Sequence, residues 1–446
     1  MTNVSSVVDL IRGEGPEQRE AFMVNVFQEA FGELAVRDAA AFRDKFRKMA
    51  SSAFAFYRGS ACLYYADVAR DTDPFADGEG SRVWIQGDLH AANFGTYMNS
   101  EGRLVFDVND FDEAYVGPFT WDVHRLAASL ALLGYEKALS DDEITEMIQV
   151  VARSYAAQVE RFASAEHTGS FALTLANTEG TLLEILQSAR LKTRVALLDE
   201  LTTIESYDRR FRLGGEVHGL DAAARETVQA AFDQYLETIP EGKLQKRINY
   251  RVKDIVAHRG VGIGSAGLPS YNLLVEGRTE ALENDIVIYM KQANVAAPSR
   301  VIDDDRIHGY FQHHGHRTVV SQRALQAYSD PWLGYTELDG AGQLVAEVGP
   351  YVSDLDWTDI NDFDSILELL ESLGRAVAKI HCVSDVDSDQ TLIDTSTDKA
   401  IAAALRGRQD EFVSSVVEFG RRYGDVVRDD HQIFIDAFRN HRVMNL

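Results

Sequence analysis

The chain has 446 residues, of which 45% are hydrophobic and 26% charged, the balance of a globular protein rather than of a disordered or fibrous one. Lys and Arg number 44 against 70 Asp and Glu, so the net charge is −26 and the overall field repels polyanions. We therefore expect neither nucleic acid nor an anionic membrane surface as a partner.

Cysteine content and the N-terminal residues bear on the compartment. Cys62 and Cys382 are too few for a disulfide framework and lack the paired spacing of a zinc site, which favours a reducing compartment. The N-terminal residues lack a basic start followed by an apolar core, and no later segment has the roughly eighteen uninterrupted apolar residues of a membrane helix. We expect a cytoplasmic protein.

Hydrophobic periodicity divides the chain into three parts. Apolar residues three and four apart, as in EITEMIQVVARSYAAQVERF, predict helices over much of the first half. Short β-rich runs such as YNLLVEG and DIVIYMK then predict a small antiparallel sheet, and helical spacing returns from Ser365 to His381. The expected parts are a helical lobe at 1–246, a β-rich lobe at 247–350 and C-terminal helices at 351–446 that return to the helical lobe.

The most specific pattern lies within residues 84–126, where WIQGDLHAANFG is followed by LVFDVNDFDEAYVGPFTWDVHRL. Asp88 and Asn93 lie five residues apart between two glycines, and Asp110 follows a predicted hairpin strand, LVFDV. Phosphoryl transfer needs an acceptor for the proton of the nucleophile and hard oxygen ligands that hold magnesium on the phosphates. Asp88 suits the base, and Asn93 and Asp110 suit the metal.

Other interpretations of this segment stay open. Asp112 is a further candidate metal ligand, which we rank below Asp110 because we expect the two carboxylates that flank one phenylalanine to point to opposite sides if the segment is extended. Asp and Asn beside Gly are also common in ordinary turns. His90 and His124 offer an alternative metal site with Asp88 and Asp110, although packing or hydrogen bonding is the simpler role for two isolated histidines.

A second pattern, GVGIGSAGLPSYNLLVEG followed by DIVIYMKQA, reads as strand, glycine loop and strand. Gly262, Gly264 and Gly267 would let the backbone approach a polyphosphate, Ser265 adds a hydroxyl, and Lys291 supplies a cation at the end of a β-rich run. A dinucleotide-binding unit would need a helix after the glycines, whereas YNLLVEG predicts a strand. A hairpin that binds no phosphate is the remaining alternative.

Together the two patterns resemble the protein-kinase-like superfamily, most closely the aminoglycoside and choline kinase branch with its HGDxxxxN and DF motifs. Gln86 stands where that branch often has histidine, and GPFTWDVHRL is similar to a run whose aspartate, here Asp122, tethers the start of a helix. The resemblance implies ATP and magnesium in a cleft between two lobes. It gives Asp88 the role of base and places Lys291 and the glycine loop on the phosphates.

The order of the patterns differs from that of a conventional kinase, in which the glycine loop and lysine precede the catalytic loop. The helical run LLESLGRAVAKIH resembles the helix that leads into the catalytic loop. The resemblance therefore implies an α+β, two-lobed kinase-like fold that is circularly permuted, with a mainly helical lobe and a small antiparallel β lobe. Nearly the whole chain, from FAFYRGSACLYYADVA to LGYTEL, also resembles an uncharacterised bacterial family called domain of unknown function 2252.

One departure from the kinase pattern leaves the activity open. Kinases pair the lysine with a glutamate on a helix, but no Glu occurs between Gln292 and Asp330, so that Gln322 or one of Asp303, Asp304 and Asp305 would have to replace it. The expected function is phosphate transfer to an unknown small-molecule or protein acceptor. The alternatives are a nucleotide-binding regulator with weak catalysis, transfer of AMP, and a metal-dependent hydrolase.

Arg58 and a group of histidines are further candidate ligand-binding residues. Arg58, in FAFYRGSA, either reaches a phosphate or is stacked or salt-bridged beside aromatic residues. The histidines near HHGH lack the spacing of one helix face and predict a polar loop or a helix start rather than a metal site. They are His308, His313, His314 and His316.

Overall fold

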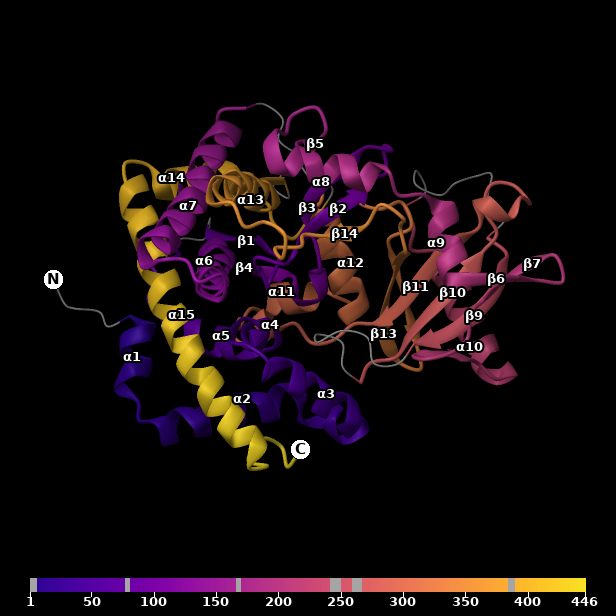
Figure 1. Ribbon diagram of the computed structural model, residues 1–446, viewed down its shortest axis with the longest axis horizontal. Coiled ribbons are helices and arrows are strands. Elements are labelled where there is room, and N and C mark those ends of the chain that lie inside the picture. Colours follow the sequence, from indigo (N-terminus) through magenta and orange to yellow (C-terminus); the bar gives the residue numbers. More distant parts are fainter. Residues whose placement is uncertain (1–5, 77–80, 166–169, 241–249, 259–266, 384–389) are drawn as a thin grey trace.

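The computed structural model describes residues 6–76, 81–165, 170–240, 250–258, 267–383 and 390–446. The chain is an α+β protein with small antiparallel sheets, as the sequence predicts. A helical lobe lies on the left of Figure 1 and a β-rich lobe on the right, and both α1 and α15 belong to the helical lobe. None of the helices in these ranges combines the length and the apolar run that crossing a bilayer requires.

The β-rich lobe is built on a six-stranded antiparallel sheet in the order β12-β13-β11-β10-β9-β8. The runs YNLLVEG and DIVIYMK form β10 and β11, and their register places Leu273 opposite Ile288. Alternation of side chains between the two faces of a strand buries Leu273 and Leu274 in different clusters. The strands are β8 (Val217–Gly219), β9 (Val252–His258), β10 (Ser270–Val275), β11 (Ile286–Gln292), β12 (Gly334–Leu338) and β13 (Ala341–Glu347).

Elements from the preceding segment cover both faces of this sheet. Phe232 of α10 belongs to the cluster on one face, and Leu198 of α9 belongs to the cluster on the other. The β-rich lobe therefore takes in elements that come before residue 247, where the sequence suggested that it begins. These elements are α9 (Arg194–Leu201), the hairpin of β6 (Thr202–Glu205) and β7 (Asp208–Phe211), and α10 (Ala222–Leu236).

Two helices separate β11 from β12. They are α11 (Asp305–Tyr310) and α12 (His314–Leu325). The longer one, α12, packs against β12 and β13 on one side and against α13 of the helical lobe on the other. It therefore connects the two lobes.

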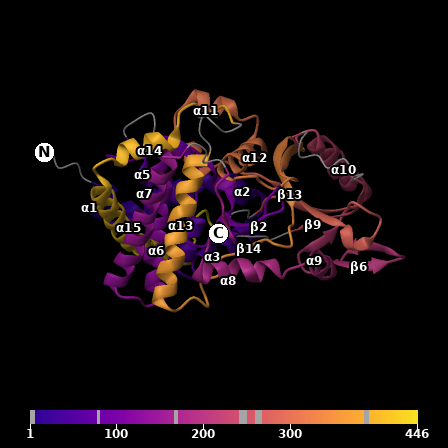
Figure 2. The ribbon, with the colours of Figure 1, turned by 90° about the horizontal axis from the view of Figure 1, so that it is seen from above.

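The helical lobe combines helices from both ends of the chain. The predicted helices at EITEMIQVVARSYAAQVERF and at 365–381 are α7 and α13, which lie along each other, while α15 lies along α6 (Figure 2). Gly374 allows this close approach, because a Cβ there would lie 2.6 Å from the Val151 carbonyl oxygen. The helices are α1 (Val7–Gly13), α2 (Pro16–Arg37), α3 (Ala39–Met49), α4 (Ala53–Gly59), α5 (Ala61–Val68), α6 (Phe119–Glu136), α7 (Asp141–Ala163), α8 (Gly180–Arg190), α13 (Phe363–Val383), α14 (Thr397–Leu405) and α15 (Gln409–Arg439).

Two small sheets occupy the middle of the molecule, at the junction of the lobes. One pairs β1 with β4, and the other has the order β14-β2-β3-β5, in which LVFDV forms β3 of the predicted hairpin. Short 3-10 turns, η2 (Phe111–Glu113) and η4 (Ala297–Arg300), adjoin them. The strands are β1 (Arg82–Ile85), β2 (Phe94–Met98), β3 (Leu104–Val108), β4 (Tyr115–Pro118), β5 (Leu173–Thr174) and β14 (Ser353–Asp354).

Buried ion pairs connect segments that are far apart in the sequence. The Arg19 guanidinium of α2 binds Asp67 of α5 at 2.7 Å and Asp430 of α15 at 2.6 Å. Lys379 of α13 forms a buried ion pair with Asp107 of β3, and its ammonium also donates to the Leu325 carbonyl at 2.9 Å. Because a buried charge is costly without its partner, these pairs restrict how the segments can be arranged.

The pair of Lys379 and Asp107 gives a test of this constraint. In a Lys379→Met variant we expect the free energy of unfolding, measured by chemical denaturation, to fall by about 3–5 kcal/mol, because Asp107 is left buried without a counter-charge. The double variant Lys379→Met/Asp107→Asn should recover much of the loss. The control Lys399→Met, at an exposed position of α14, should change the value by less than about 0.5 kcal/mol. Equal losses of unfolding free energy in Lys379→Met and Lys399→Met would contradict the role of the ion pair.

Candidate functional site

A cavity of about 480 Å³ lies between the lobes, within the size range of small-molecule sites. The β-rich lobe contributes Lys291 of β11 and apolar side chains of β13, and the helical lobe contributes polar side chains from the loops around β2 and β3. The segment from β13 to β14 closes one side. Lining residues include Asn93, Asn109, Asp110, Asp112, Tyr289, Gln322, Gln326, Leu344, Ala346, Val348 and Tyr351.

A second, smaller cavity of about 50 Å³ adjoins the first. Arg58, Asp110 and Asp112 line both cavities and so form their common wall. Asp88 lines the smaller cavity and is not among the described residues that line the larger one. The expected base and the expected phosphate-binding lysine therefore lie on opposite sides of one carboxylate wall.

The loop that carries Asp88 is fixed by Asp122, in the first turn of α6. The fully buried Asp122 carboxylate accepts hydrogen bonds from the backbone N–H of Gln86 at 2.6 Å and of Gly87 at 3.0 Å. His381 of α13 lies 3.3 Å from the same carboxylate. Gly87 has φ +83°, and a Cβ there would meet the Glu113 carbonyl oxygen at 2.0 Å, so that only glycine fits.

Gln86 connects the Asp88 loop to the Asp110 loop. Its side-chain oxygen accepts from the Asp88 backbone N–H at 2.8 Å, while its amide nitrogen donates to the carbonyl oxygens of Asn109 at 3.1 Å and Asp110 at 2.5 Å. One amide group thus uses both its donor and its acceptor within the site. Gln86 therefore has a defined positioning role between the two loops.

Asp88 is held by Arg125, which the sequence did not single out. The Arg125 Nε donates to Asp88 Oδ1 at 2.7 Å, Nη2 donates to the Tyr57 carbonyl at 3.0 Å, and the guanidinium lies 4.3 Å from the Tyr57 ring centroid. Burial raises the pKa of Asp88 to about 7 although Arg125 opposes the shift. Arg125 follows Asp122 by three residues on one helix, a spacing that could have indicated its place beside the loop.

The expected metal ligands lie close to Asp88 and to one another. Asn93 donates through Nδ2 to the Asp88 carbonyl at 2.9 Å, so that Oδ1 is the atom that suits a cation. Asp110 adopts a left-handed conformation with φ +52°, which is uncommon for a residue other than glycine. Burial, followed by the nearby Asp112, raises the pKa of Asp110 to about 6.

The expectation that Asp110 and Asp112 point to opposite sides is wrong, because side chains two residues apart share one face of an extended strand and because this segment is not extended. Residues 111–113 form the 3-10 turn η2, and both carboxylates face the cavities. Asp112 forms an ion pair with Lys291. Burial opposes the charge of Lys291, but Asp112 and Asp110 outweigh it and raise the pKa of this lysine.

The lysine partner therefore comes from the Asp110 loop and not from the residues suggested by sequence. Asp304 instead caps α11 and binds Arg82 at 2.8 Å, whereas Gln322 lines the larger cavity. The helix after β11 contributes a different contact. Arg317 of α12 donates to the carbonyl oxygens of Asp112 at 2.7 Å and Ala114 at 2.6 Å, and thereby supports the loop that carries the partner.

Of the glycine loop, Gly262, Gly264 and Ser265 lie outside the described residues. Gly267 is described and has φ +75°, where a Cβ would lie 3.4 Å from the Asp38 Cβ. Gly267 is thus beside the N-terminal helices, and it is not among the described residues that line the larger cavity.

The histidines flagged in the sequence have packing and capping contacts. His90 packs edge-on against Phe54, and His124 is stacked on Phe419 at 4.3 Å. His313 caps α12 by accepting from the His316 N–H, as expected for a helix start. Within the described ranges, His, Cys, Asp and Glu form no group of three or more that could hold a metal ion.

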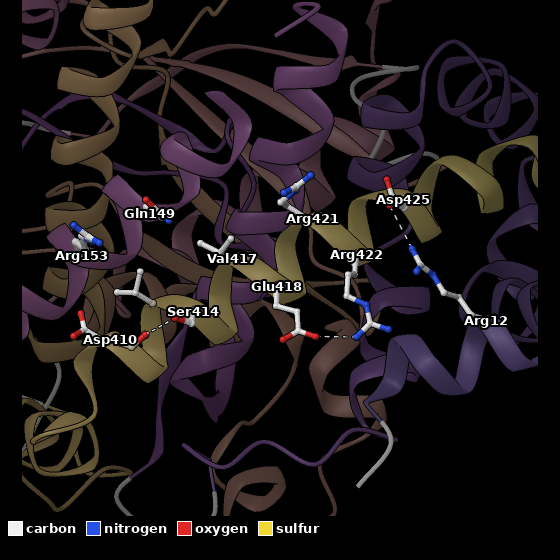
Figure 3. A pocket seen from close by; sticks show the side chains of 11 residues that line it. Arg12, Gln149, Arg153, Asp410, Ser414, Val417, Glu418, Arg421, Arg422 and Asp425 are labelled. Carbon is white, nitrogen blue, oxygen red and sulfur yellow. Dashed lines mark hydrogen bonds and ion pairs between the residues drawn. The ribbon is translucent and has the colours of Figure 1, made fainter. Parts of the chain in front are cut away.

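A larger, open cavity of about 680 Å³ lies between α7 and α15, away from the lobe junction (Figure 3). Its arginines are largely paired with carboxylates of the same surface. Arg12 binds Asp425 at 3.3 Å, and Arg422 binds Glu418 at 2.9 Å. Charges that neutralise one another at a solvated surface make this cavity a weaker candidate than the one between the lobes.

The family model for "Uncharacterized protein conserved in bacteria (DUF2252)" matches residues 37–437. All the site residues from Asp88 to Lys291 lie within the matched range. Neither a curated protein nor a solved structure matches the chain.

The contact of Asp122 with the loop yields a second prediction. Asp122→Ala leaves the buried N–H groups of Gln86 and Gly87 without an acceptor, so we expect the free energy of unfolding to fall by about 2–5 kcal/mol. Hydrogen exchange should accelerate at these two amides more than in β10 and β11. Asp142→Ala, at an exposed position in the first turn of α7, is the control and should cost less than about 1 kcal/mol. Unchanged protection of both amides would refute the assignment.

Proposed function

The chain belongs to the DUF2252 family of uncharacterised bacterial proteins, and we propose from the residues of its site that it is a phosphotransferase that uses ATP and magnesium. ATP occupies the larger cavity between the lobes, and the hydroxyl group of an unknown small-molecule or protein acceptor enters beside Asp88. The observation that carries the proposal is the common wall of Asp110 and Asp112 between the cavities of Lys291 and Asp88.

The proposed reaction uses this separation. The acceptor oxygen attacks the γ-phosphorus, the bond from that phosphorus to the β,γ-bridging oxygen breaks, ADP leaves, and the hydroxyl proton passes to Asp88. Arg125 binds Oδ1 of Asp88, which makes Oδ2 the oxygen that accepts the proton. A carboxyl group with a pKa of about 7 suits a base that works near neutral pH.

The donor set suits magnesium. An amide oxygen of Asn93 and a carboxylate of Asp110 are hard ligands, and Mg²⁺ in nucleotide sites is bound by one or two such groups together with phosphate oxygens. When bound, the ion would neutralise the charge of the phosphates. Lys291 adds a fixed positive charge on the side of the larger cavity. Asp112, already paired with Lys291, is the weaker metal ligand of the two aspartates.

The arrangement of elements supports a kinase-like fold. Counted from β9, Lys291 lies on the third strand and a helix, α12, precedes the fourth, which is the position of the kinase lysine and of the helix that follows it. The catalytic segment belongs to the other lobe. His381, at the end of α13, contacts Asp122, so α13 ends beside the Asp88 loop. In a kinase of conventional order, the corresponding helix comes directly before the catalytic loop in the sequence. This contact supports circular permutation.

One observation favours a second candidate function. The partner of Lys291 is Asp112 rather than a helix-borne glutamate, and such an altered pair fits a regulator that binds nucleotide with weak catalysis. AMP transfer is the other alternative. ATP labelled on the α- or the γ-phosphate separates the three, because phosphate transfer moves only the γ label, AMP transfer moves the α label, and a regulator retains both labels in ATP.

Lys291 provides a test of nucleotide binding. We expect Lys291→Ala to weaken Mg-ATP binding roughly 10- to 100-fold, because a charge-assisted contact to phosphate is lost. The measurement is the rise of the unfolding midpoint with Mg-ATP, each variant being compared with its own ligand-free state. Lys48→Ala, at an exposed position of α3, should behave as wild type. Equal rises in all three proteins would remove Lys291 from the site.

Asp88 provides a separate test of catalysis. Asp88→Asn should slow turnover by roughly 10²- to 10⁴-fold, the usual contribution of a general base, while Mg-ATP still raises the unfolding midpoint. The assay is release of ADP or transfer of the γ label. Wild-type turnover in this variant would exclude Asp88 as the base, and loss of Mg-ATP binding would assign it to nucleotide binding instead.

A further inference from the structure

The smaller cavity has a distinctive set of charged groups beyond Asp88. Three cations line it from three separate elements, Lys45 from α3, Arg58 from α4 and Arg300 from η4. The Lys45 ammonium is buried and lies 4.3 Å from the Phe31 ring centroid. Arg58 and Arg300 are exposed at this site. The N-terminal helices and η4 thus bring positive charge to the cavity that Asp88 lines, and Lys291 is not among the described residues that line it.

The carboxylates of the cavity are engaged by other groups. Asp88 pairs with Arg125, Asp112 pairs with Lys291, and Glu113 accepts from the Ala297 N–H. Asp110 is the carboxylate that magnesium would neutralise. With these partners in place, none of the four carboxylates forms an ion pair with Arg58 or Arg300 among the described residues.

The two arginines have no carboxylate partner within the described part of the chain. Arg300 donates to the carbonyl oxygens of Glu29 and Ala30 at 3.3 and 3.5 Å, which are weak contacts to neutral groups. Arg58 forms no ion pair with a described residue and lies where both cavities meet. Guanidinium groups in such positions are suited to bind carboxylate or phosphate oxygens.

The size of the cavity restricts what can enter. About 50 Å³ corresponds to a few water molecules and accommodates a group the size of a phosphate or carboxylate, but not a sugar ring or a polypeptide segment. The cavity also contains the thiol of Cys62, and burial raises its pKa to about 12, so that it remains neutral. The lining therefore combines three cations and a neutral thiol with the four carboxylates named above.

We propose that the acceptor is a small anionic hydroxyl compound whose carboxylate or phosphate group binds Arg58 and Arg300, in the cavity that the buried Lys45 also lines. This inference rests on the proposed phosphotransferase function and adds the charge class of its substrate. Binding of the anionic group at this position would bring a neighbouring hydroxyl to Asp88, because all four side chains line the same cavity.

Inorganic phosphate is a suitable probe in protein saturated with magnesium and the β,γ-imido analogue of ATP, since the analogue already fills the nucleotide phosphate positions. The unfolding midpoint is followed against phosphate concentration at constant ionic strength, with chloride as the reference anion. We expect a saturable rise specific to phosphate. Arg58→Gln and Arg300→Gln should each weaken phosphate binding roughly tenfold or more, whereas Arg43→Gln, at an exposed position of α3, should leave it unchanged.

The results distinguish failure of the anionic acceptor from failure of the phosphotransferase function. If the analogue with magnesium does not raise the midpoint, the proposed phosphotransferase function fails. If the analogue raises it but phosphate does no more than chloride, only the anionic acceptor is refuted. Arg300 lines the smaller cavity alone, so an Arg300→Gln variant that weakens the analogue and not phosphate would move this arginine to the nucleotide and also overturn the inference.

Discussion

The buried carboxylate of Asp122 is the contact on which the rest of the site depends. It binds two successive backbone N–H groups of the Asp88 loop and receives His381 from the C-terminal part of the chain. A loop whose donors are taken up in this way cannot move without leaving them unsatisfied, which is costly in the interior. Asp122 therefore fixes Asp88 and, through Gln86, the carbonyl of Asp110.

The same contact explains why both ends of the chain are needed for one site. Asp122 and Arg125 come from α6, whereas Lys379 and His381 come from the last turns of α13 and contact β3 and Asp122. The N-terminal helices supply Lys45 and Arg58 to the smaller cavity. Ion pairs with low exposure join these distant segments, and their desolvation makes alternative arrangements unfavourable.

The ion pair of Lys291 with Asp112 connects the larger cavity, which Lys291 lines, to the wall that both cavities share. Asp112 belongs to the wall between them, and Arg317 supports its backbone from the helix that joins the lobes. A change in the position of this helix would thus act on the lysine through the loop. Arg317 therefore connects α12 to Lys291 indirectly, through the loop that carries Asp112.

The sequence by itself determined the α+β class, the strands at YNLLVEG and DIVIYMK, the helices α7 and α13, and the grouping of Asp88, Asn93 and Asp110, because periodicity and glycine-bounded motifs are local properties. Tertiary structure alone decided the partners. Asp112 and Arg317 acquire their roles from contacts with segments 179 and 205 residues away along the chain. The 3-10 turn η2 places Asp112 where it forms the ion pair with Lys291. An ion pair between distant segments leaves no pattern in one stretch of sequence, because only folding brings its two residues together.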